Sequence, residues 1–230
     1  MTLGELRSAL RSRLADVSPD YLWSDAELNS FLNQATDEAC IRARLIVDST
    51  SVVVTSIAVA AGVNQYPIHK SVFFIDRAFD LGSKRELTKI GHDEMDEKFL
   101  KWPDDTGIPT RFLLDMNYYH VPGAEEHTHK MTIYPTPLAS STIQLTVFRL
   151  PLEAMESDGD TPEIPTHLHP DLLHWACHLA YLKHDSETSD PSRTAMYAEL
   201  FAQAFGPKQD ALMMEYRRKK RAKRVIARWL

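Results

Sequence analysis

Residues 164–185 have the sequence IPTHLHPDLLHWACHLAYLKHD, in which leucine, alanine and aromatic residues recur at helical spacing. The stretch follows an acidic segment that contains proline, and it is the first long helical pattern after a region of strand-like patterns. It therefore marks the return of the chain to helices. Five of the ten histidines lie in it, which raises the question of a metal site: His167, His169, His174, His178 and His184.

Two amphipathic helices are predicted at the N-terminus. Thr2 and Glu5 have the spacing of a capping box, and a stripe of leucines follows them as far as Leu14. Ser24 and Glu27 form a second capping box, after which apolar residues continue at helical spacing to about residue 47. The first 47 residues therefore predict a pair of helices joined by a turn.

The middle of the chain has a different pattern. Short runs of β-branched and aromatic residues are divided by glycine and proline, which favours an antiparallel sheet or sandwich over βαβ units. A short helix is expected within this region over residues 92–102, and a final helix is expected from about 190 to 216 or beyond, where Asp190 and Pro191 form its cap. The expected strands cover residues 50–59, 66–68, 72–79, 84–90, 110–121, 130–134 and 142–150.

These elements predict an α+β fold, in which a helical bundle is built from N- and C-terminal helices and carries an inserted antiparallel β domain. The predicted layout assigns residues 1–48 and 164–216 to the helical bundle and 49–151 to the inserted β-rich domain. Residues 152–163 form an acidic linker, and 217–230 form a basic C-terminal arm.

The histidines do not form a recognised catalytic motif. His174 and His178 are four residues apart and share a helix face, as helical zinc ligands often do, and His167 and His169 can add ligands from the preceding turn. However, the HxxxH spacing lacks the glutamate of a metalloprotease HExxH motif. Packing or subunit contact is the favoured role of these histidines, and a metal-dependent hydrolase is kept as an alternative.

Other candidate sites have simpler explanations. His127 and His129 lie in a predicted hairpin loop, and the acidic residues between Asp93 and Glu97 suit the first turn of a helix. The two cysteines, Cys40 and Cys177, are expected to be reduced and buried. There is no GxSxG motif, phosphate-binding loop or dinucleotide-binding glycine motif. We therefore expect no catalytic residues, no metal, no cofactor and no enzymatic activity.

The charge of the chain is divided unevenly. The net charge is −6, yet residues 217–230, RRKKRAKRVIARWL, contain eight of the 26 basic residues and no acidic residue. The other 216 residues carry 18 basic and 32 acidic side chains, a balance of −14. An acidic body with a basic tail is suited to binding through the tail. No run of 18 apolar residues is present, so no membrane span is expected, and the N-terminus lacks the apolar core of a signal peptide.

The basic run is followed by an apolar end. A solvated helix terminus, a localisation signal or a non-specific nucleic-acid contact each accounts for the charge alone. Charge followed by a terminal tryptophan favours an arm that becomes ordered when it docks on a partner protein. The predicted binding residues are Arg217, Arg218, Lys219, Lys220, Arg221, Lys223, Arg224, Val225, Ile226, Arg228, Trp229 and Leu230.

Three stretches carry a resemblance to a known family. They are the opening helices with WSDAEL at residues 23–28, the strand region with GIP at 107–109 and MTIYPTP at 131–137, and the sequence IP at 164–165 that leads into an alanine-containing helix. Together they cover most of the chain, and the whole arrangement resembles the head-to-tail adaptor (connector) proteins of tailed bacteriophages. These motifs are structural, and none is a catalytic signature.

The resemblance implies a ring, with twelve copies expected, beneath the portal of the capsid. Such a ring surrounds passing DNA without reading its sequence, contacts the portal protein, and offers a platform to tail or nozzle proteins. The resemblance also implies a place in the neck of the virion after synthesis in the host cytoplasm, and it gives residues 217–230 the role of a portal-binding arm. A nucleic-acid-binding protein that acts through the basic tail is kept as an alternative.

Overall fold

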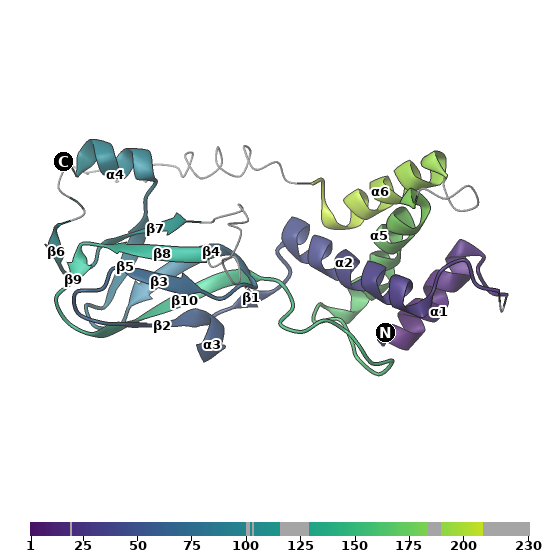
Figure 1. Cartoon of the computed structure of the whole chain (residues 1–230), viewed down its shortest axis with the longest axis horizontal. Helices are drawn as coiled ribbons and strands as arrows, with labels where there is room; N and C mark the ends of the chain where they lie inside the picture. The colour runs from purple at the N-terminus through teal and green to yellow at the C-terminus, as the bar shows by residue number, and fades with distance from the viewer. Residues whose placement is uncertain (19, 100–101, 103, 116–128, 184–189, 209–230) are drawn as a thin grey trace, which may run out of the picture.

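The computed structural model describes residues 1–18, 20–99, 102, 104–115, 129–183 and 190–208. Figure 1 shows four longer helices at one end of the molecule and a twisted β-sheet at the other, which we call the helical part and the sheet part. The helices are α1 (Leu3–Leu14), α2 (Asp25–Ala43), α3 (Val52–Thr55), α4 (His92–Lys98), α5 (His169–Leu182) and α6 (Pro191–Phe205), and a 3-10 turn spans Thr166–Leu168. The strands are β1 (Val47–Asp48), β2 (Ser56–Val59), β3 (Gln65–Ile68), β4 (Val72–Asp80), β5 (Arg85–Lys89), β6 (Thr106–Gly107), β7 (Arg111–Asp115), β8 (His129–Tyr134), β9 (Thr136–Pro137) and β10 (Ser141–Arg149).

Both predicted capping boxes are confirmed. The Thr2 hydroxyl accepts the Glu5 amide at 3.3 Å, and the Thr2 amide donates to the Glu5 carboxylate at 3.0 Å. Ser24 and Glu27 repeat this exchange at the start of α2. Each box satisfies amide groups that the first turn of a helix leaves without an intrahelical partner.

The four longer helices pack around two adjoining apolar clusters. In the first, leucines of α1 and α2 meet one face of α5, which contributes Leu173, Ala176 and Ala180. In the second, Ala35 and Ala39 of α2 meet Phe201 and Phe205 of α6. Helices from the two ends of the chain therefore share cores, as the sequence patterns predict. These apolar contacts are the main source of stability for helices of this length.

β10 pairs with three of the described strands of the sheet part. It pairs with β4 on one side and with both β1 and β2 on the other, and the order of the main sheet is β1-β10-β4-β5-β7-β8-β3, with β2 beside β10. The strands predicted over 66–68, 72–79, 84–90, 130–134 and 142–150 are confirmed as β3, β4, β5, β8 and β10. Most of their inward side chains form one apolar cluster, while Tyr134 of β8 joins a smaller cluster with Met95 of α4, and both are separate from the clusters of the helical part.

The prediction of a purely antiparallel sheet is wrong at two pairings. β5 and β7 run parallel, with Thr88 opposite Arg111, and so do the short strands β6 and β9. A parallel pair needs a crossover connection, because the chain must return to the same end of the sheet. α4 lies in the connection between β5 and β7 and makes this return possible.

The strand predicted over residues 50–59 is correct only from Ser56 onward. Val52–Thr55 form a single helical turn, although three valines in succession favour a strand. The carboxylate of Asp48 accepts hydrogen bonds from the amides of Thr50 and Ser51, and the Thr55 hydroxyl donates to the Ser51 carbonyl. These side chain–backbone bonds replace strand pairing and override the β propensity.

Three predicted elements end earlier in the structure. α2 stops at Ala43, before residue 47, because Arg44 adopts the left-handed conformation with φ of 53°. α4 ends at Lys98, and α6 ends at Phe205 because Gly206 has φ of 90° and Pro207 follows. Residues 209–216 of the predicted last helix and 116–121 of the predicted strand over 110–121 lie outside the described residues.

Two connections join the helical part to the sheet part. One leads from α2 into β1, and the other leads from β10 through residues 150–165 to α5 (Figure 1). Within the described ranges, no helix has both the length and the apolar character needed to cross a membrane. The geometry of these two connections sets how the two parts sit against each other.

Candidate functional site

All twelve predicted arm residues, from Arg217 to Leu230, lie outside the described residues. The structure does describe how α6, the helix that precedes them, is held. Phe201 and Phe205 are 0% and 4% exposed, and the Phe201 ring lies 5.0 Å from the Trp175 ring of α5. The C-terminal end of α6 is therefore firmly packed against α5.

Arg42 of α2 fixes this end further. Its guanidinium lies 4.6 Å from the centre of the Trp175 ring and 5.0 Å from that of Phe201, and it pairs with Glu38 at 2.8 Å. It also donates a hydrogen bond to the Gly206 carbonyl at 3.4 Å. A buried arginine stacked on two aromatic rings holds the point where the chain leaves α6.

The three histidines of α5 contact four residues outside this helix. His169 is buried, with Nδ1 lying 2.9 Å from the Met1 amine and Nε2 lying 3.0 Å from the Ile164 carbonyl oxygen. Nδ1 of His174 lies 3.3 Å from the Arg13 guanidinium of α1, and Nδ1 of His178 lies 2.9 Å from the Thr194 carbonyl of α6. Burial, together with Arg13, lowers the pKa of His174. These contacts join α5 to its neighbours, in agreement with a packing role.

No metal site is assembled from these residues. Among the parts of the chain that the structure describes, no three histidine, cysteine or carboxylate side chains are grouped closely enough to hold a metal ion. His127 and His184 lie outside those parts. The two cysteines, Cys40 and Cys177, are buried and unpaired, and burial raises the pKa of each thiol to about 12. Neither thiol is therefore an activated nucleophile.

The acidic residues of α4 are engaged in local contacts. Glu94 pairs with Lys98 one turn along the helix, and the Asp96 carboxylate accepts a hydrogen bond from the Trp102 indole at 2.8 Å. The two carboxylates serve different neighbours and do not form a catalytic pair.

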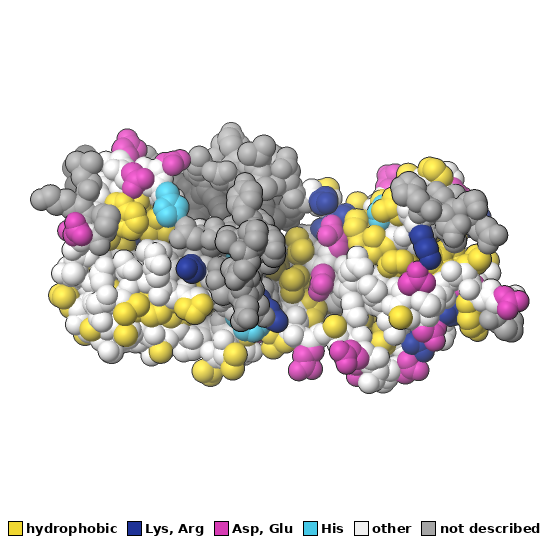
Figure 2. All heavy atoms as spheres, viewed as in Figure 1, with side chains coloured by type: hydrophobic (Ala, Val, Ile, Leu, Met, Phe, Trp, Pro, Cys, Tyr) yellow, Lys and Arg dark blue, Asp and Glu magenta, His cyan; other side chains and the backbone are white. Residues whose placement is uncertain are grey.

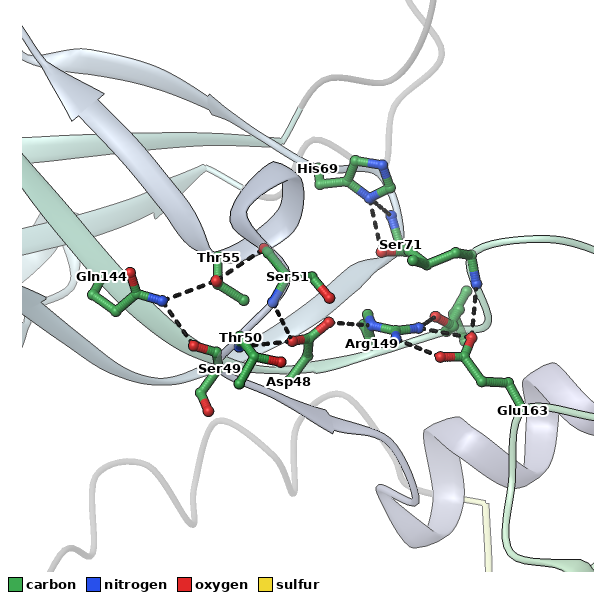
Figure 3. A network of polar contacts seen from close by, with 12 residues as sticks. Asp48, Ser49, Thr50, Ser51, Thr55, His69, Ser71, Gln144, Arg149 and Glu163 are labelled. Atoms are coloured by element: carbon green, nitrogen blue, oxygen red, sulfur yellow. Dashed lines mark hydrogen bonds and ion pairs between the residues drawn. The ribbon is translucent and has the colours of Figure 1, made fainter.

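An extensive polar network lies where the helical part meets the sheet part (Figure 1). Arg149, at the end of β10, donates to the Asp48 carboxylate of β1 at 2.7 Å and binds the Glu163 carboxylate through both terminal nitrogens (Figure 3). The side chains of Arg149 and Asp48 are only 7% and 4% exposed. Arg149 therefore joins both connections between the two parts, because Asp48 belongs to one of them and Glu163 to the other.

The charges of this network stabilise one another. Burial by itself would raise the pKa of Asp48, but the Ser51 amide and the Arg149 guanidinium outweigh it and hold that pKa well below its ordinary value. The hydrogen bonds from Arg149 also lower the pKa of Glu163. On the opposite side of the network, the Gln144 amide donates to the Ser49 carbonyl at 2.8 Å and to the Thr55 hydroxyl at 2.9 Å. The network therefore extends from the linker to α3, and we call it the junction network.

A cleft of about 360 Å³ lies beside the junction network, between α2 and residues 150–163. Its lining exposes more apolar than polar surface and includes Asp37, whose pKa is raised by burial. At its wall, Asn33 exchanges two hydrogen bonds of 3.0 Å with the backbone of Met155. Across the cleft, the Ser71 hydroxyl lies 2.8 Å from Nδ1 of His69, which also accepts the Ser71 amide at 3.2 Å. The His69 ring therefore bonds to the backbone as well as to the hydroxyl of the turn before β4, and the Asn33 bonds tie the acidic linker to α2.

Sequence reasoning did not single out the junction network. Asp48 and Arg149 are separated by 101 positions, and no spacing rule connects residues so far apart. The only signal in the sequence was an arginine at the end of a predicted strand that enters an acidic linker.

Comparison with known proteins identifies the family. Residues 1–224 match the family model described as SU10 adaptor protein, so the match includes the helical part, the sheet part and most of the basic run. No curated protein matches the chain. The chain therefore belongs to the SU10 adaptor protein family and is a phage head-tail adaptor protein.

Proposed function

We propose that the protein forms a ring beneath the capsid portal, docks there through residues 217–230 and offers the opposite side to tail or nozzle proteins. The ring, with twelve copies expected, encloses the DNA exit channel in the neck of the virion and has a structural role without catalysis. The division into a helical bundle of 1–48 and 164–216, an inserted domain of 49–151, a linker of 152–163 and an arm of 217–230 is part of this proposal. Family membership supports a structural adaptor role.

The charge asymmetry is the observation that carries the proposed docking. Eight basic residues and no acidic one are concentrated in residues 217–230, while the rest of the chain has a balance of −14. An acidic body repels the phosphates of passing DNA and so favours sliding over binding, whereas the basic arm attracts acidic protein surfaces. The Arg42 contacts support the proposal by fixing the end of α6, from which the chain continues toward residue 217.

Truncation after Tyr216 tests the docking. The shortened chain keeps every described contact that holds α6, so it is expected to keep the melting temperature of the full chain and to lose binding to isolated portals. A matched variant replaces the seven cations between residues 217 and 224 with serine but keeps the apolar end, and thereby separates charge from apolar contact. Normal portal binding by the truncated chain would contradict the proposal.

The same basic run supports nucleic-acid binding as a second candidate function. In that case the full chain binds duplex DNA tightly, and its affinity falls steeply with salt because counterions are released from the phosphates. If the full chain binds DNA weakly and portals tightly, the result favours the adaptor role over the nucleic-acid-binding role.

A further inference from the structure

We propose that one uncharged edge of the sheet part is the surface through which a copy of this chain contacts a second copy. The surface, which we call the uncharged strip, contains exposed residues of α3, β2 and the two loops beyond β2 and β9. The inference rests on the proposed ring and identifies the part of the molecule on which ring formation depends. Its principal residues are Val52, Val53, Ala58, Ala60, Val63 and Leu138.

The strip is apolar and continuous. Val53 is 84% exposed, Val52 73%, Leu138 69% and Val63 43%. α3 leads directly into β2, and the amide of Gly62 beyond β2 donates to the Pro137 carbonyl at 2.8 Å, which joins the loop that contains Val63 to the loop that contains Leu138. A contiguous exposed apolar surface of this kind is typical of an interaction site, whereas single exposed apolar residues are not.

The strip also lacks charge. Residues 49–68 and 131–148 contain no Asp, Glu, Lys or Arg, although 25% of the chain is charged. Figure 2 shows the consequence on the surface, because the lower side of the sheet part is white and yellow without dark blue or magenta, and both charged colours cover the helical part. Burial explains the uncharged inward residues of these strands, but it does not explain the exposed ones.

β2 is a short edge strand that contains neither a charged residue nor proline. It pairs with β10 from Ser56 to Val59, and no other described strand pairs with it. Natural proteins protect such edges with charged residues, proline or bulges, because an open edge pairs readily with other chains. The exposed position of β2 is instead Ala58. An edge of this composition is expected to be covered in the assembled protein.

α3 presents its valines by means of the junction network. Asp48, Gln144 and Thr55 hold residues 50–55 away from the strand conformation that their β-branched side chains favour. Val52 and Val53 consequently extend into solvent, while Val54 is 4% exposed and joins the core of the sheet. A conflict between local preference and observed structure is characteristic of functional positions.

Charge identifies the occupant as a second copy. Without residues 217–230 the chain has a balance of −14, so two copies repel each other wherever their acidic surfaces meet. An uncharged apolar surface allows two identical acidic chains to approach without placing like charges opposite each other. A ring requires a heterologous contact, in which the strip of one copy meets a different surface of the next.

Charge introduced into the strip tests the inference. Val53→Glu and Ala58→Lys change exposed positions toward the two ends of the α3–β2 segment. Because one substitution adds a negative charge and the other a positive charge, a loss of association in both variants cannot result from the change in net charge. Thr88→Glu is the matched control, because Thr88 is an exposed strand position of the same sheet among charged residues. Particle mass of the full chain, alone and with isolated portals, gives the number of associated copies, and melting temperature verifies folding.

Both strip variants are expected to weaken association between copies at least about tenfold, because an unpaired charge would be buried at the contact, whereas Thr88→Glu associates as the unaltered chain does. Full copy number on portals for both strip variants would overturn the inference and leave the proposed ring intact. A photo-crosslinker at position 53 that reacts with portal protein and not with a second copy would likewise overturn it. An unaltered chain that binds portals only as single copies would contradict both the ring and the strip.

Discussion

The helical part and the sheet part both have apolar cores, but their surfaces differ in composition. On the helical part, exposed charged side chains are numerous and paired, as when Lys183 contacts Glu27 at 2.8 Å and Arg193 contacts Asp190 at 3.3 Å. On the sheet part, a whole edge has no charge, and its valines and Leu138 face solvent. A paired, charged surface is stable in water, whereas an uncharged apolar edge gains stability when it is covered.

The difference separates two tasks in one chain. The helical part has the surface of a protein that faces solvent, and it holds the end of α6 from which the chain continues toward the basic run. The sheet part presents the uncharged strip. The junction network connects the two, so changes to it are expected to affect both parts, and changes within either core are expected to affect one.

Removal of the central arginine is expected to have the largest effect. Arg149→Ala leaves the buried carboxylate of Asp48 without its partner and should lower the free energy of unfolding by about 3–5 kcal/mol. The matched control is Arg77→Ala, because Arg77 and its partner Glu86 are both about half exposed and such pairs contribute only about 0–1 kcal/mol. Denaturant titration measures both variants. Equal losses from the two substitutions would show that Arg149 does not hold the connections together.

Core truncations test whether the two parts are separate. Leu32→Ala in α2 and Leu145→Ala in β10 each remove a fully buried side chain and should cost about 2–5 kcal/mol. Hydrogen exchange is expected to increase mainly in the helices for the first variant and mainly in the strands for the second, because the side chains belong to different clusters. Leu182→Ala, at an exposed position of α5 outside the uncharged strip, is the control and should change little. Equal loss of protection in both parts after either core substitution would mean that they unfold as one unit.

The pH dependence is expected to be the smallest of these effects. Asp48 and Glu163 have pKa values below their ordinary ones, so their contribution is fully present above a pH of about 4 to 4.5 and is lost as the pH falls through the lowered values. When the pH is lowered from about 6 to about 3, the free energy of unfolding should therefore decrease for both chains. The decrease should be smaller for Asp48→Asn than for the unaltered chain, by on the order of 1–3 kcal/mol. Glu86→Gln, at an exposed carboxylate, should keep the original dependence. Chemical denaturation at each pH provides the comparison, and identical slopes for Asp48→Asn and the unaltered chain would contradict it.

Local patterns predicted the helices better than the sheet. The capping boxes at Thr2 and Ser24 depend on residues three positions apart, so the sequence was sufficient to place both helix starts. The parallel pairing of β5 with β7 depends on a crossover through α4, which short-range patterns do not specify. The helical turn of Val52–Thr55 depends on Gln144, a residue 89 positions away from Thr55.

The sites differ in the same way. The basic run is contiguous and was visible from composition alone. The junction network joins residues from three separate segments and required the fold. The uncharged strip was only partly predictable from the sequence. The absence of charge from residues 49–68 and 131–148 is visible in the sequence. Only the structure places the two runs side by side and shows which of their residues are exposed.

Particle mass tests the central claim most directly. The full chain is mixed with isolated portals, and the mass of the complex is compared with that of the portals and of the chain by themselves. The proposed ring predicts a complex that contains many copies of the chain in a fixed number, and chain truncated after Tyr216 should leave the portal mass unchanged. A full chain that adds no mass to portals, or a truncated chain that adds as much as the full one, would contradict the claim.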